Sequence, residues 1–209
     1  MPLFRSSFAL IYFVHIPKAG GSSVEKALNT KGVKSAMMIS KARNTETNYS
    51  KCTPQHIHAD VYGAYFPDNF IDYAFTVCRN PFGRMASEYK MKVINGKEDA
   101  TPSDWITTSI DRCREFPYTR DNHIRPQKYF LAPHVQKFKL EDGLQKPIAA
   151  AFKALGLSAP SKVPHSRKGP EEKLIITKRT LDLIRDFYHD DFETLGYDKT
   201  DYSAHFEIR

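Results

Sequence analysis

Two runs of apolar residues organise the first half of the chain, and each leads into a helical pattern. Residues 8–14 and 71–78 are rich in β-branched and aromatic side chains on both faces, which is typical of buried parallel strands. Apolar residues then recur at helical spacing, at Val24, Ala27 and Leu28 after the first run and at Met85, Tyr89 and Val93 after the second. Two strand–helix units in succession predict an α/β fold with a parallel sheet.

Polar residues mark where both of these helices are expected to begin. Ser22 and Glu25 have the S-x-x-E spacing of a capping box at the start of the first helix. Asn80 can cap the second helix, and Pro81 suits its first turn, where a missing N–H loses no hydrogen bond. Each helix is therefore predicted to follow its strand after a short connection.

The rest of the chain shows weaker patterns. Residues 105–113, 147–155 and 180–195 have helical periodicity with Gly196 expected to end the last helix, residues 135–140 alternate as in a strand, and polar loops are expected at 30–54, 95–104 and 158–173. There is no internal repeat or low-complexity tract. The pattern and the length of the chain predict a single domain of residues 1–209.

Composition narrows the class of protein without deciding it. The 209 residues are enough to bury a core without disulfides, and 41% hydrophobic residues is ordinary for a globular protein. Thirty-one lysines and arginines against 24 acidic residues give a net charge of +7. This excess favours either solubility or an anionic ligand such as a nucleotide, a nucleic acid or an acidic polysaccharide.

The cysteines and the first apolar run bear on the location of the protein. Cys52, Cys78 and Cys113 are widely spaced and form no C-x-x-C pair, which fits reduced thiols of a cytoplasm rather than a metal site or a disulfide framework. Residues 8–14 are too few to span a bilayer and run directly into a glycine-rich segment. We therefore expect a soluble, cytoplasmic protein without a transmembrane segment.

The segment FVHIPKAGGSS, residues 13–23, has the composition of an anion-binding loop. Its two glycines let the backbone turn and approach a ligand, and the amides that follow can point at an anion at the positive end of the helix. Ser22 and Ser23 add hydroxyl donors, and Lys18 places an ammonium at the mouth of the loop. A plain strand-to-helix turn with a surface lysine is the alternative interpretation.

A second motif follows the second apolar run. Arg79 comes at the end of the predicted strand, and Ser87 lies in the helix after it. If the two strands are parallel neighbours, these residues open onto the same sheet edge as the glycine loop, where ligands of open α/β sheets bind. A guanidinium and a hydroxyl suit a second phosphate. One molecule with two separated anionic groups would account for both motifs.

These two motifs resemble the 5′-phosphosulfate loop and the 3′-phosphate motif of carbohydrate sulfotransferases. FVHIPKAGGSS and VCRNPFGRMASEY are more closely similar to the Golgi enzymes that sulfate glycosaminoglycans, including heparan-sulfate 2-O-type enzymes, and to their bacterial relatives. Weaker motifs follow in the family's order, namely HIRPQKYFL, VQKFKLEDG, PHSRKGPEEKLIIT and FYHDDFETLGYD. The resemblance therefore covers most of the chain.

The resemblance carries expectations about fold and chemistry. It implies a P-loop-like, three-layer α/β fold with a central, mainly parallel sheet flanked by helices. It also implies the sulfuryl donor 3′-phosphoadenosine 5′-phosphosulfate (PAPS), which leaves as 3′-phosphoadenosine 5′-phosphate (PAP), and a hydroxyl acceptor, expected on a carbohydrate or glycolipid. No metal is expected, because a sulfuryl group carries less charge than a phosphoryl group. Nucleic acid is not expected as a partner.

Site residues follow from the same resemblance. HIHADVYGAYF resembles the His-x-His segment of the heparan-type enzymes, so His58 matches the proposed general base, a role that suits a side chain whose charge changes near neutral pH. Lys18 would stabilise the leaving phosphate. The expected donor-binding residues are Pro17, Lys18, Ala19, Gly20, Gly21, Ser22, Ser23, Arg79, Ser87, Ser166, Arg167 and Lys168. The expected acceptor-side residues are His56, His123, Arg125 and Gln127, with His123 as the alternative base.

The chain departs from the family pattern in a few places. Gly83 stands where the family often has an acidic residue, which we interpret as a surface difference, and Ile124 replaces a common tryptophan beside the acceptor groove. The membrane anchor and luminal cysteines of the Golgi enzymes are absent from this sequence, which favours a soluble microbial enzyme. His15 and Trp105 are expected to have structural roles.

Two other functions compete with sulfuryl transfer. A P-loop kinase or NTPase would carry its lysine after the glycines, in G-x-x-x-x-G-K-[ST], and would require Mg²⁺. In this chain Ser22 follows Gly21 directly and the lysine comes first. A non-catalytic basic binder of acidic glycan or nucleic acid would need a basic stripe interleaved with aromatic residues, which the sequence lacks.

Overall fold

The computed structural model describes residues 2–38, 51–67, 69–94, 96, 99–161, 163 and 172–209. The chain divides into two compact units, one formed by residues 1–78 and 129–166, the other by residues 79–128 and 167–209. The chain thus passes from one unit to the other after residues 78, 128 and 166. The expectation of a single domain over residues 1–209 stays a prediction.

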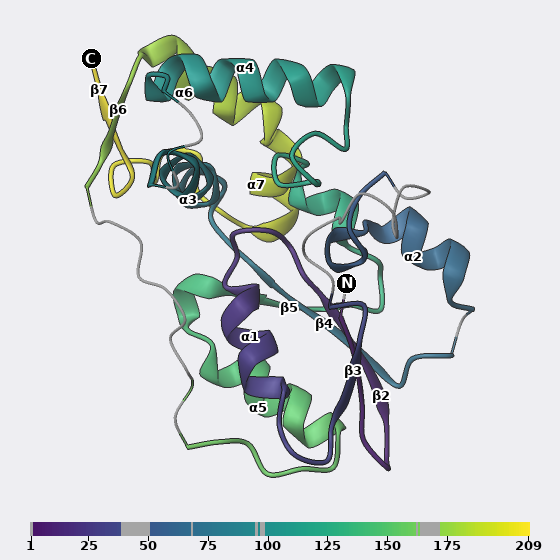
Figure 1. Ribbon diagram of the computed structural model, residues 1–209. Helices are drawn as coiled ribbons and strands as arrows, with labels where there is room; N and C mark the ends of the chain where they lie inside the picture. Colours follow the sequence, from purple (N-terminus) through teal and green to yellow (C-terminus); the bar gives the residue numbers. More distant parts are fainter. Residues whose placement is uncertain are drawn as a thin grey trace. The chain divides into compact units, whose positions relative to one another are not determined.

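A five-stranded sheet forms the centre of the first unit (Figure 1). Its strands lie in the order β3 (Lys34–Ala36), β1 (Leu3–Arg5), β2 (Leu10–Val14), β4 (Tyr73–Cys78) and β5 (Gln136–Lys139). The pairs β2–β4 and β4–β5 are parallel, whereas β1 is antiparallel to both of its neighbours. Four strands therefore run in one direction, which confirms the predicted α/β class with a mainly parallel sheet.

Helices cover both faces of this sheet. On one face, α1 (Gly21–Leu28) and α5 (Gln145–Ala154) pack against the apolar side of β2 and β4, in a core that includes Phe13 and Phe75. On the other face, Tyr62 of α2 (Ala59–Tyr65) stacks on Tyr12 with ring centroids 4.1 Å apart. Successive side chains of β2 point to opposite faces of the sheet, so Tyr12 and Phe13 are both buried. Burial of one large apolar side chain stabilises the folded state by about 1.5–3 kcal/mol.

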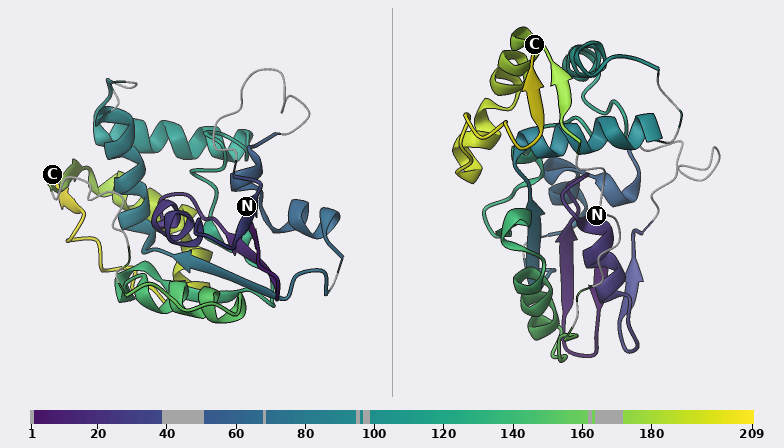
Figure 2. Two further views of the ribbon diagram at one scale, coloured as in Figure 1. Left: turned by 60° about the horizontal axis from the view of Figure 1, so that its bottom comes forward. Right: turned by 90° about the vertical axis from the view of Figure 1, so that its left-hand side faces the viewer.

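The second unit is mainly helical. It contains α3 (Pro81–Ile94), α4 (Pro102–Glu115), α6 (Lys178–Phe187) and α7 (His189–Leu195), together with the strands β6 (Leu174–Ile176) and β7 (Phe206–Ile208). The two strands form a separate parallel pair (Figure 2). Apolar faces of the helices meet in one core that includes Phe82, Ile106, Ile184 and Phe192, and Trp105 is buried in it as expected.

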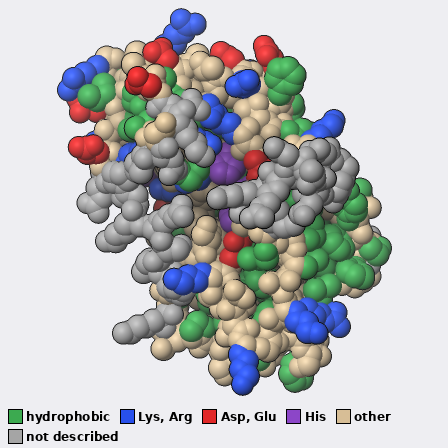
Figure 3. All heavy atoms as spheres, in the orientation of Figure 1, with side chains coloured by type: hydrophobic (Ala, Val, Ile, Leu, Met, Phe, Trp, Pro, Cys, Tyr) green, Lys and Arg blue, Asp and Glu red, His purple; other side chains and the backbone are tan. Residues whose placement is uncertain are grey.

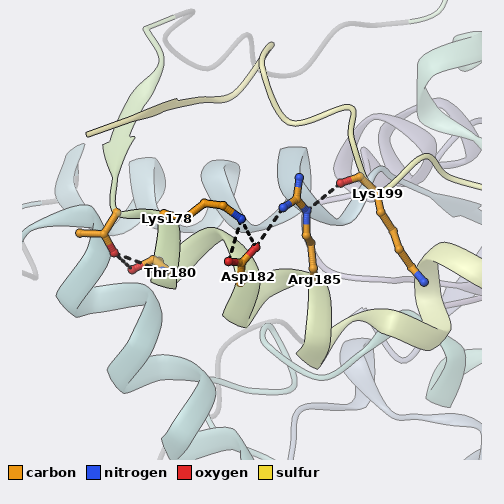
Figure 4. A network of polar contacts seen from close by, with 6 residues as sticks. Lys178, Thr180, Asp182, Arg185 and Lys199 are labelled. Carbon is orange, nitrogen blue, oxygen red and sulfur yellow. Dashed lines mark hydrogen bonds and ion pairs between the residues drawn. The ribbon is translucent and has the colours of Figure 1, made fainter.

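The start of α6 shows how local polar contacts fix a helix in this unit (Figure 4). Thr177 caps the helix by accepting a hydrogen bond from the amide of Thr180 at 3.2 Å, an interaction worth about 1 kcal/mol. Asp182 accepts hydrogen bonds from Lys178 at 2.7 Å and from Arg185 at 3.0 Å. The bond from Lys178 is the main reason why the pKa of Asp182 is lowered. Such exposed pairs orient side chains more than they stabilise the fold.

The structure differs from the sequence pattern at several elements. The pattern of residues 180–195 predicts one helix, but α6 and α7 are separate because the backbone leaves helical geometry at Tyr188. The hydroxyl of Tyr188 donates to the carbonyl of Ile124 at 2.7 Å, a tertiary contact that periodicity cannot reveal. Neither α2 nor the short strands β1 and β3 were predicted. No helix in the described ranges has the length and apolar character needed to cross a membrane.

Candidate functional site

The glycine loop connects β2 to α1 in the first unit. Two of its residues have positive φ angles, Lys18 at 68° and Gly20 at 84°. The amide of Ala19 donates to the carbonyl of Ile16 at 3.3 Å, which closes the turn before the helix. Left-handed backbone at a lysine costs about 1–2 kcal/mol, so the surrounding structure must impose this conformation. The loop therefore has a defined and strained shape.

At both glycines an added side chain would force a neighbouring group to move. A Cβ at Gly20 would lie 2.8 Å from Cδ1 of Leu140. A Cβ at Gly21 would lie 2.3 Å from Nε2 of His15, because the imidazole ring packs directly against the glycine backbone. The glycines thus serve close packing beneath the loop as well as the turn itself.

The start of α1 differs from the predicted capping box. The N-cap residue is Gly20, which has no side chain to accept from the first amides, and Ser23 donates its amide to the carbonyl of Gly20 at 3.0 Å. Glu25 does not reach back to the cap; it points into the interior and is 8% exposed. The capping-box prediction is therefore wrong. A helix start without a side-chain cap presents its amides and positive dipole end to an anion.

The loop residues differ in their exposure. Ser22 is exposed at the start of the helix, while Lys18 and Gly20 are partly buried. Pro17, Ala19, Gly21 and Ser23 are buried. The loop thus offers the lysine side chain, one exposed hydroxyl and backbone amides as groups able to contact a ligand from the solvent side.

Glu25 is the centre of a buried polar cluster beneath the loop. Its carboxylate bonds to Nδ1 of His15 and accepts from Nε2 of Gln55 at 2.7 and 2.8 Å. Burial alone would raise the pKa of Glu25, but hydrogen bonds from His15 and Gln55 and the charges of His15 and His56 lower it overall. The carboxylate is therefore ionised and fully engaged at neutral pH.

The His-x-His segment lies in the same unit as the glycine loop. His56 ends the short 3₁₀ helix Pro54–His56, and its ring meets that of His15 edge-on at 5.0 Å. His58 is the N-cap residue of α2, is 5% exposed, and lies 3.7 Å from the exposed carboxylate of Asp60. His56 is therefore directly connected to the cluster beneath the loop, and His58 follows it by two residues.

The parallel register of β2 and β4 brings the ends of both strands to one edge of the sheet. Val14 pairs with Thr76, whose hydroxyl donates to the carbonyl of Val14 at 2.7 Å. The glycine loop begins after Val14, and the chain continues from Cys78 directly into Arg79, the first residue of the second unit. The assumption that these strands are parallel neighbours is thus confirmed.

Arg79 lies beside the first turns of α3. Asn80 caps this helix through its Oδ1, which accepts from the amide of Phe82 at 2.9 Å, as predicted. A Cβ at Gly83 would lie 3.1 Å from Nε of Arg79 and 2.7 Å from Nε2 of His205. Gly83 is buried beneath these side chains, so its interpretation as a surface difference is wrong. The glycine makes room for the guanidinium.

Lys90 is a cation that the sequence reasoning missed. Burial lowers its pKa, and the charge of Arg79 lowers it further. Gly83, Ser87 and Lys90 recur at spacings of four and three on α3, which places them along one face of the helix. Arg79, Ser87 and Lys90 therefore form a basic, hydroxyl-bearing surface in the second unit. The helical spacing was visible in the sequence, but the nearness of Lys90 to Arg79 was not.

Gln127 holds the backbone of Arg79. Its Oε1 accepts from the amide of Arg79 at 3.0 Å, and its Nε2 donates to the carbonyl of Arg79 at 2.8 Å. Asp191 in turn accepts from the amides of Gln127 and Lys128, each at 2.8 Å. Gln127 is fully buried, so the contacts seen here serve the donor-side motif.

Arg84 organises the segment that contains the other expected acceptor residues. Its guanidinium donates to the carbonyls of His123 at 2.7 Å and Arg125 at 2.8 Å. Nδ1 of His123 lies 2.8 Å from the buried carboxylate of Glu88. Ile124, between His123 and Arg125 in the sequence, is fully buried in the core. His123 and Arg125 are thus held by backbone and side-chain bonds to α3.

The expected site residues fall into two groups, one in each unit. The first unit contains residues 17–23 with His56 and His58, and the second contains Arg79 and Ser87 with His123, Arg125 and Gln127. Ser166, Arg167 and Lys168 lie outside the described residues. Sequence reasoning missed Glu25 and Gln55 as site-supporting residues, because their contacts join segments thirty residues apart.

A mainly parallel sheet flanked by helices, with a glycine loop between β2 and α1, defines the protein as an α/β protein. The sequence profile of the sulfotransferase family matches residues 2–198. The chain therefore belongs to the sulfotransferase family, which confirms that part of the resemblance seen in the sequence. Membership supports sulfuryl transfer to an acceptor as the general activity.

A solved structure adds a comparison at the level of the fold. A sulfotransferase from Alicyclobacillus acidocaldarius is 15% identical, with a TM-score of 0.48 over 92% of this chain and 98% of that one. No curated protein sequence matched.

Proposed function

We propose that this protein is a PAPS-dependent O-sulfotransferase with a P-loop-like fold that acts on a carbohydrate or glycolipid hydroxyl. The observation that supports this most is the glycine loop of a sulfotransferase-family chain, strained at Lys18 and capped by Gly20 without a side chain. The residues fit an anionic donor, because amides, one exposed hydroxyl and an ammonium converge in one short segment. The donor supplies the activated sulfuryl group.

Residues 17–23 would hold the 5′ end of the donor. The amides at the start of α1 and the hydroxyl of Ser22 donate to anionic oxygens, and the dipole of the helix favours negative charge there. Lys18 stabilises the charge that develops on the leaving phosphate oxygen. Pro17 and Ala19 contribute shape, because both are buried.

The 3′-phosphate would be held by Arg79 and Ser87. This assignment is supported by the basic surface that Arg79, Ser87 and Lys90 form, in which Lys90 is a third group able to contact a phosphate. Gln127 and Asp191 fix the backbone of Arg79 and so limit the freedom of its side chain. We assign Ser166, Arg167 and Lys168 to the same end of the nucleotide, as the family resemblance implies.

The acceptor hydroxyl would lose its proton to His58. A general base contributes about 10²–10⁴-fold to a reaction of this kind. His56 supports the base-bearing segment, since it contacts His15 beneath the loop. His123 remains the alternative base, with Arg125 on the acceptor side, and Glu88 holds the ring of His123 in place. Gln127 is given no acceptor contact, because its buried amide is bonded to the backbone of Arg79.

Both rival functions make different predictions. A kinase or NTPase would depend on ATP and Mg²⁺, whereas the proposed enzyme requires neither. A non-catalytic basic binder would need a continuous basic surface. On the face that Figure 3 shows, the lysine and arginine side chains of the described residues are dispersed in small groups.

A transfer assay over a panel of glycan, glycolipid and small-alcohol acceptors tests the proposal. We expect sulfuryl transfer from PAPS that is unaffected by EDTA, with no phosphoryl transfer from ATP. Transfer that requires ATP and Mg²⁺ would overturn the proposal. Salt-sensitive binding of glycans without any transfer would favour the non-catalytic binder.

A further inference from the structure

Three segments of the first unit meet at one buried carboxylate. Glu25 comes from α1, His15 directly follows β2, and Gln55 comes from the short helix Pro54–His56. All three side chains are at most 8% exposed. Burying an ionised carboxylate is costly unless several donors satisfy it, and removing one partner leaves the charge uncompensated. The cluster therefore resists any displacement of its members.

One arm of this cluster reaches the glycine loop. His15 bonds to Glu25 through Nδ1, and the opposite edge of its ring packs against the backbone of Gly21. The position of Gly21 at the start of α1 thus depends on how Glu25 holds the imidazole. A shift of the ring would move the amides that face the donor.

The other arm reaches the segment with the proposed base. Nε2 of Gln55 donates to both oxygens of Glu25, and His56, the next residue, also lowers the pKa of Glu25 through its charge. The ring of His56 meets that of His15 edge-on. His58 follows two residues later, at the N-cap position of α2. Glu25 therefore fixes the backbone that leads to His58.

We propose that Glu25 is a positioning residue that holds the base-bearing segment in register with the donor loop, through Gln55 on one side and His15 on the other. This inference rests on the proposed function, since it assigns Glu25 a role in the same reaction. Loss of Gln55 should disturb the base-bearing segment and leave the donor loop in place. Loss of His15 should disturb the donor loop and, through the ring contact with His56, the base-bearing segment as well. Misplacement of a catalytic group by about 1 Å can cost about 10²-fold in rate.

Two variants separate the arms. Gln55→Met keeps the size of the side chain but removes both hydrogen bonds, so we expect kcat to fall about tenfold or more, with the Kd for PAP within about twofold of wild type. His15→Gln removes the ring that packs on Gly21, so we expect the Kd for PAP to rise about tenfold. Glu25→Gln should show both effects. Lys26→Ala, at an exposed position of the same helix, is the matched control.

Titration of PAP, transfer from PAPS to the acceptor that the panel selects, and thermal unfolding would be measured for each variant. If Glu25→Gln does not fold, Gln55→Met and His15→Gln still test the proposal, because each retains the Glu25 carboxylate and one of its partners. Wild-type turnover and affinity in all variants would overturn the role of Glu25 alone. Equal losses of kcat and PAP affinity in Gln55→Met would also overturn it, because they would indicate a general loss of structure rather than displacement of the base-bearing segment alone. Absence of PAP binding and transfer in the wild type would overturn the proposed function as well.

Discussion

At the scale of single residues, two side chains of the first unit are assigned different parts of the reaction. Lys18 lies in the strained turn that we propose binds the donor, whereas His58 is the N-cap residue of α2 in a separate segment. Because the proposal assigns Lys18 to the leaving phosphate and His58 to the acceptor, nucleotide binding should distinguish the removal of one from the removal of the other.

Lys18→Ala is expected to lower turnover by about 10²–10³-fold and to weaken PAP binding. His58→Ala should lower turnover by about 10²–10⁴-fold while the Kd for PAP stays unchanged. Isothermal titration and a transfer assay measure the two effects, with the exposed residues Lys26 and His189 replaced by alanine as controls. Near wild-type turnover in His58→Ala would reject it as the base and favour His123.

The lowered pKa of Glu25 predicts how the stability of the fold depends on pH. Its folded-state pKa lies below the ordinary value of 4.5, so its ionisation stabilises the fold above that value, and the contribution is lost as the pH falls through the lowered pKa. Wild type should therefore exceed Glu25→Gln in urea stability at about pH 7, and the gap should narrow toward about pH 3. A gap that is the same at both pH values would show that Glu25 does not stabilise the fold through its charge.

At the scale of elements, the connection from β2 to α1 combines positive φ angles with close side-chain contacts. Gly20 has a φ of +84° and close contact with Leu140, whereas Gly32 has a φ of +88° with no heavy atom within 4 Å of its would-be Cβ. Both glycines have a positive φ, which glycine adopts without strain, but their surroundings differ. They offer a matched pair of substitutions.

Gly32→Ala should lower the free energy of unfolding by about 1–2 kcal/mol, because alanine is strained at positive φ. Gly20→Ala should lower it by at least as much, because Leu140 must also shift to make room for the methyl group. Only Gly20→Ala should also weaken PAP binding, since Gly20 is the N-cap residue of α1, the helix proposed to bind the donor. Chemical denaturation and titration of PAP measure the two effects. Equal PAP affinity in both variants would mean that the shape of the loop does not matter for the donor.

The face of α3 gives a prediction for the other end of the nucleotide. Lys90→Ala should weaken binding of PAP about tenfold, because a charge-assisted contact to the 3′-phosphate is lost. Binding of AMP, which lacks that phosphate, should change little. Arg112→Ala, at an exposed position of α4, is the control. A similar loss for AMP would place Lys90 elsewhere in the site or in folding.

The predictable elements were those whose sequence pattern is local. Both long apolar runs became β2 and β4, and Asn80 with Pro81 starts α3 as its sequence indicates. Glu25 was misread, because its spacing from Ser22 fits a capping box while its true partners come from other segments. Gly83 was misread for a similar reason. One of the side chains that pack over it, His205, is far away in the sequence, so its contact could not be inferred from the local pattern.

At the scale of the whole molecule, the chain combines a sheet-based unit with a mainly helical one, and expected site residues occur in both. The chain passes from the first unit to the second directly after β4, between Cys78 and Arg79. The central claim is that residues 17–23 and the Arg79–Ser87 motif bind the two anionic ends of a single nucleotide. It requires a ligand whose affinity depends on both groups of residues.

Calorimetric titration of PAP, AMP and ATP against wild type, Lys18→Ala and Arg79→Ala tests this claim most directly. The account predicts one PAP per chain, AMP at least about tenfold weaker because it lacks the second phosphate, and a loss of PAP affinity in both variants. Arg79→Ala should lose affinity for PAP but not for AMP. Equal affinities for PAP and AMP in the wild type, or binding of Mg²⁺–ATP in preference to PAP, would contradict it.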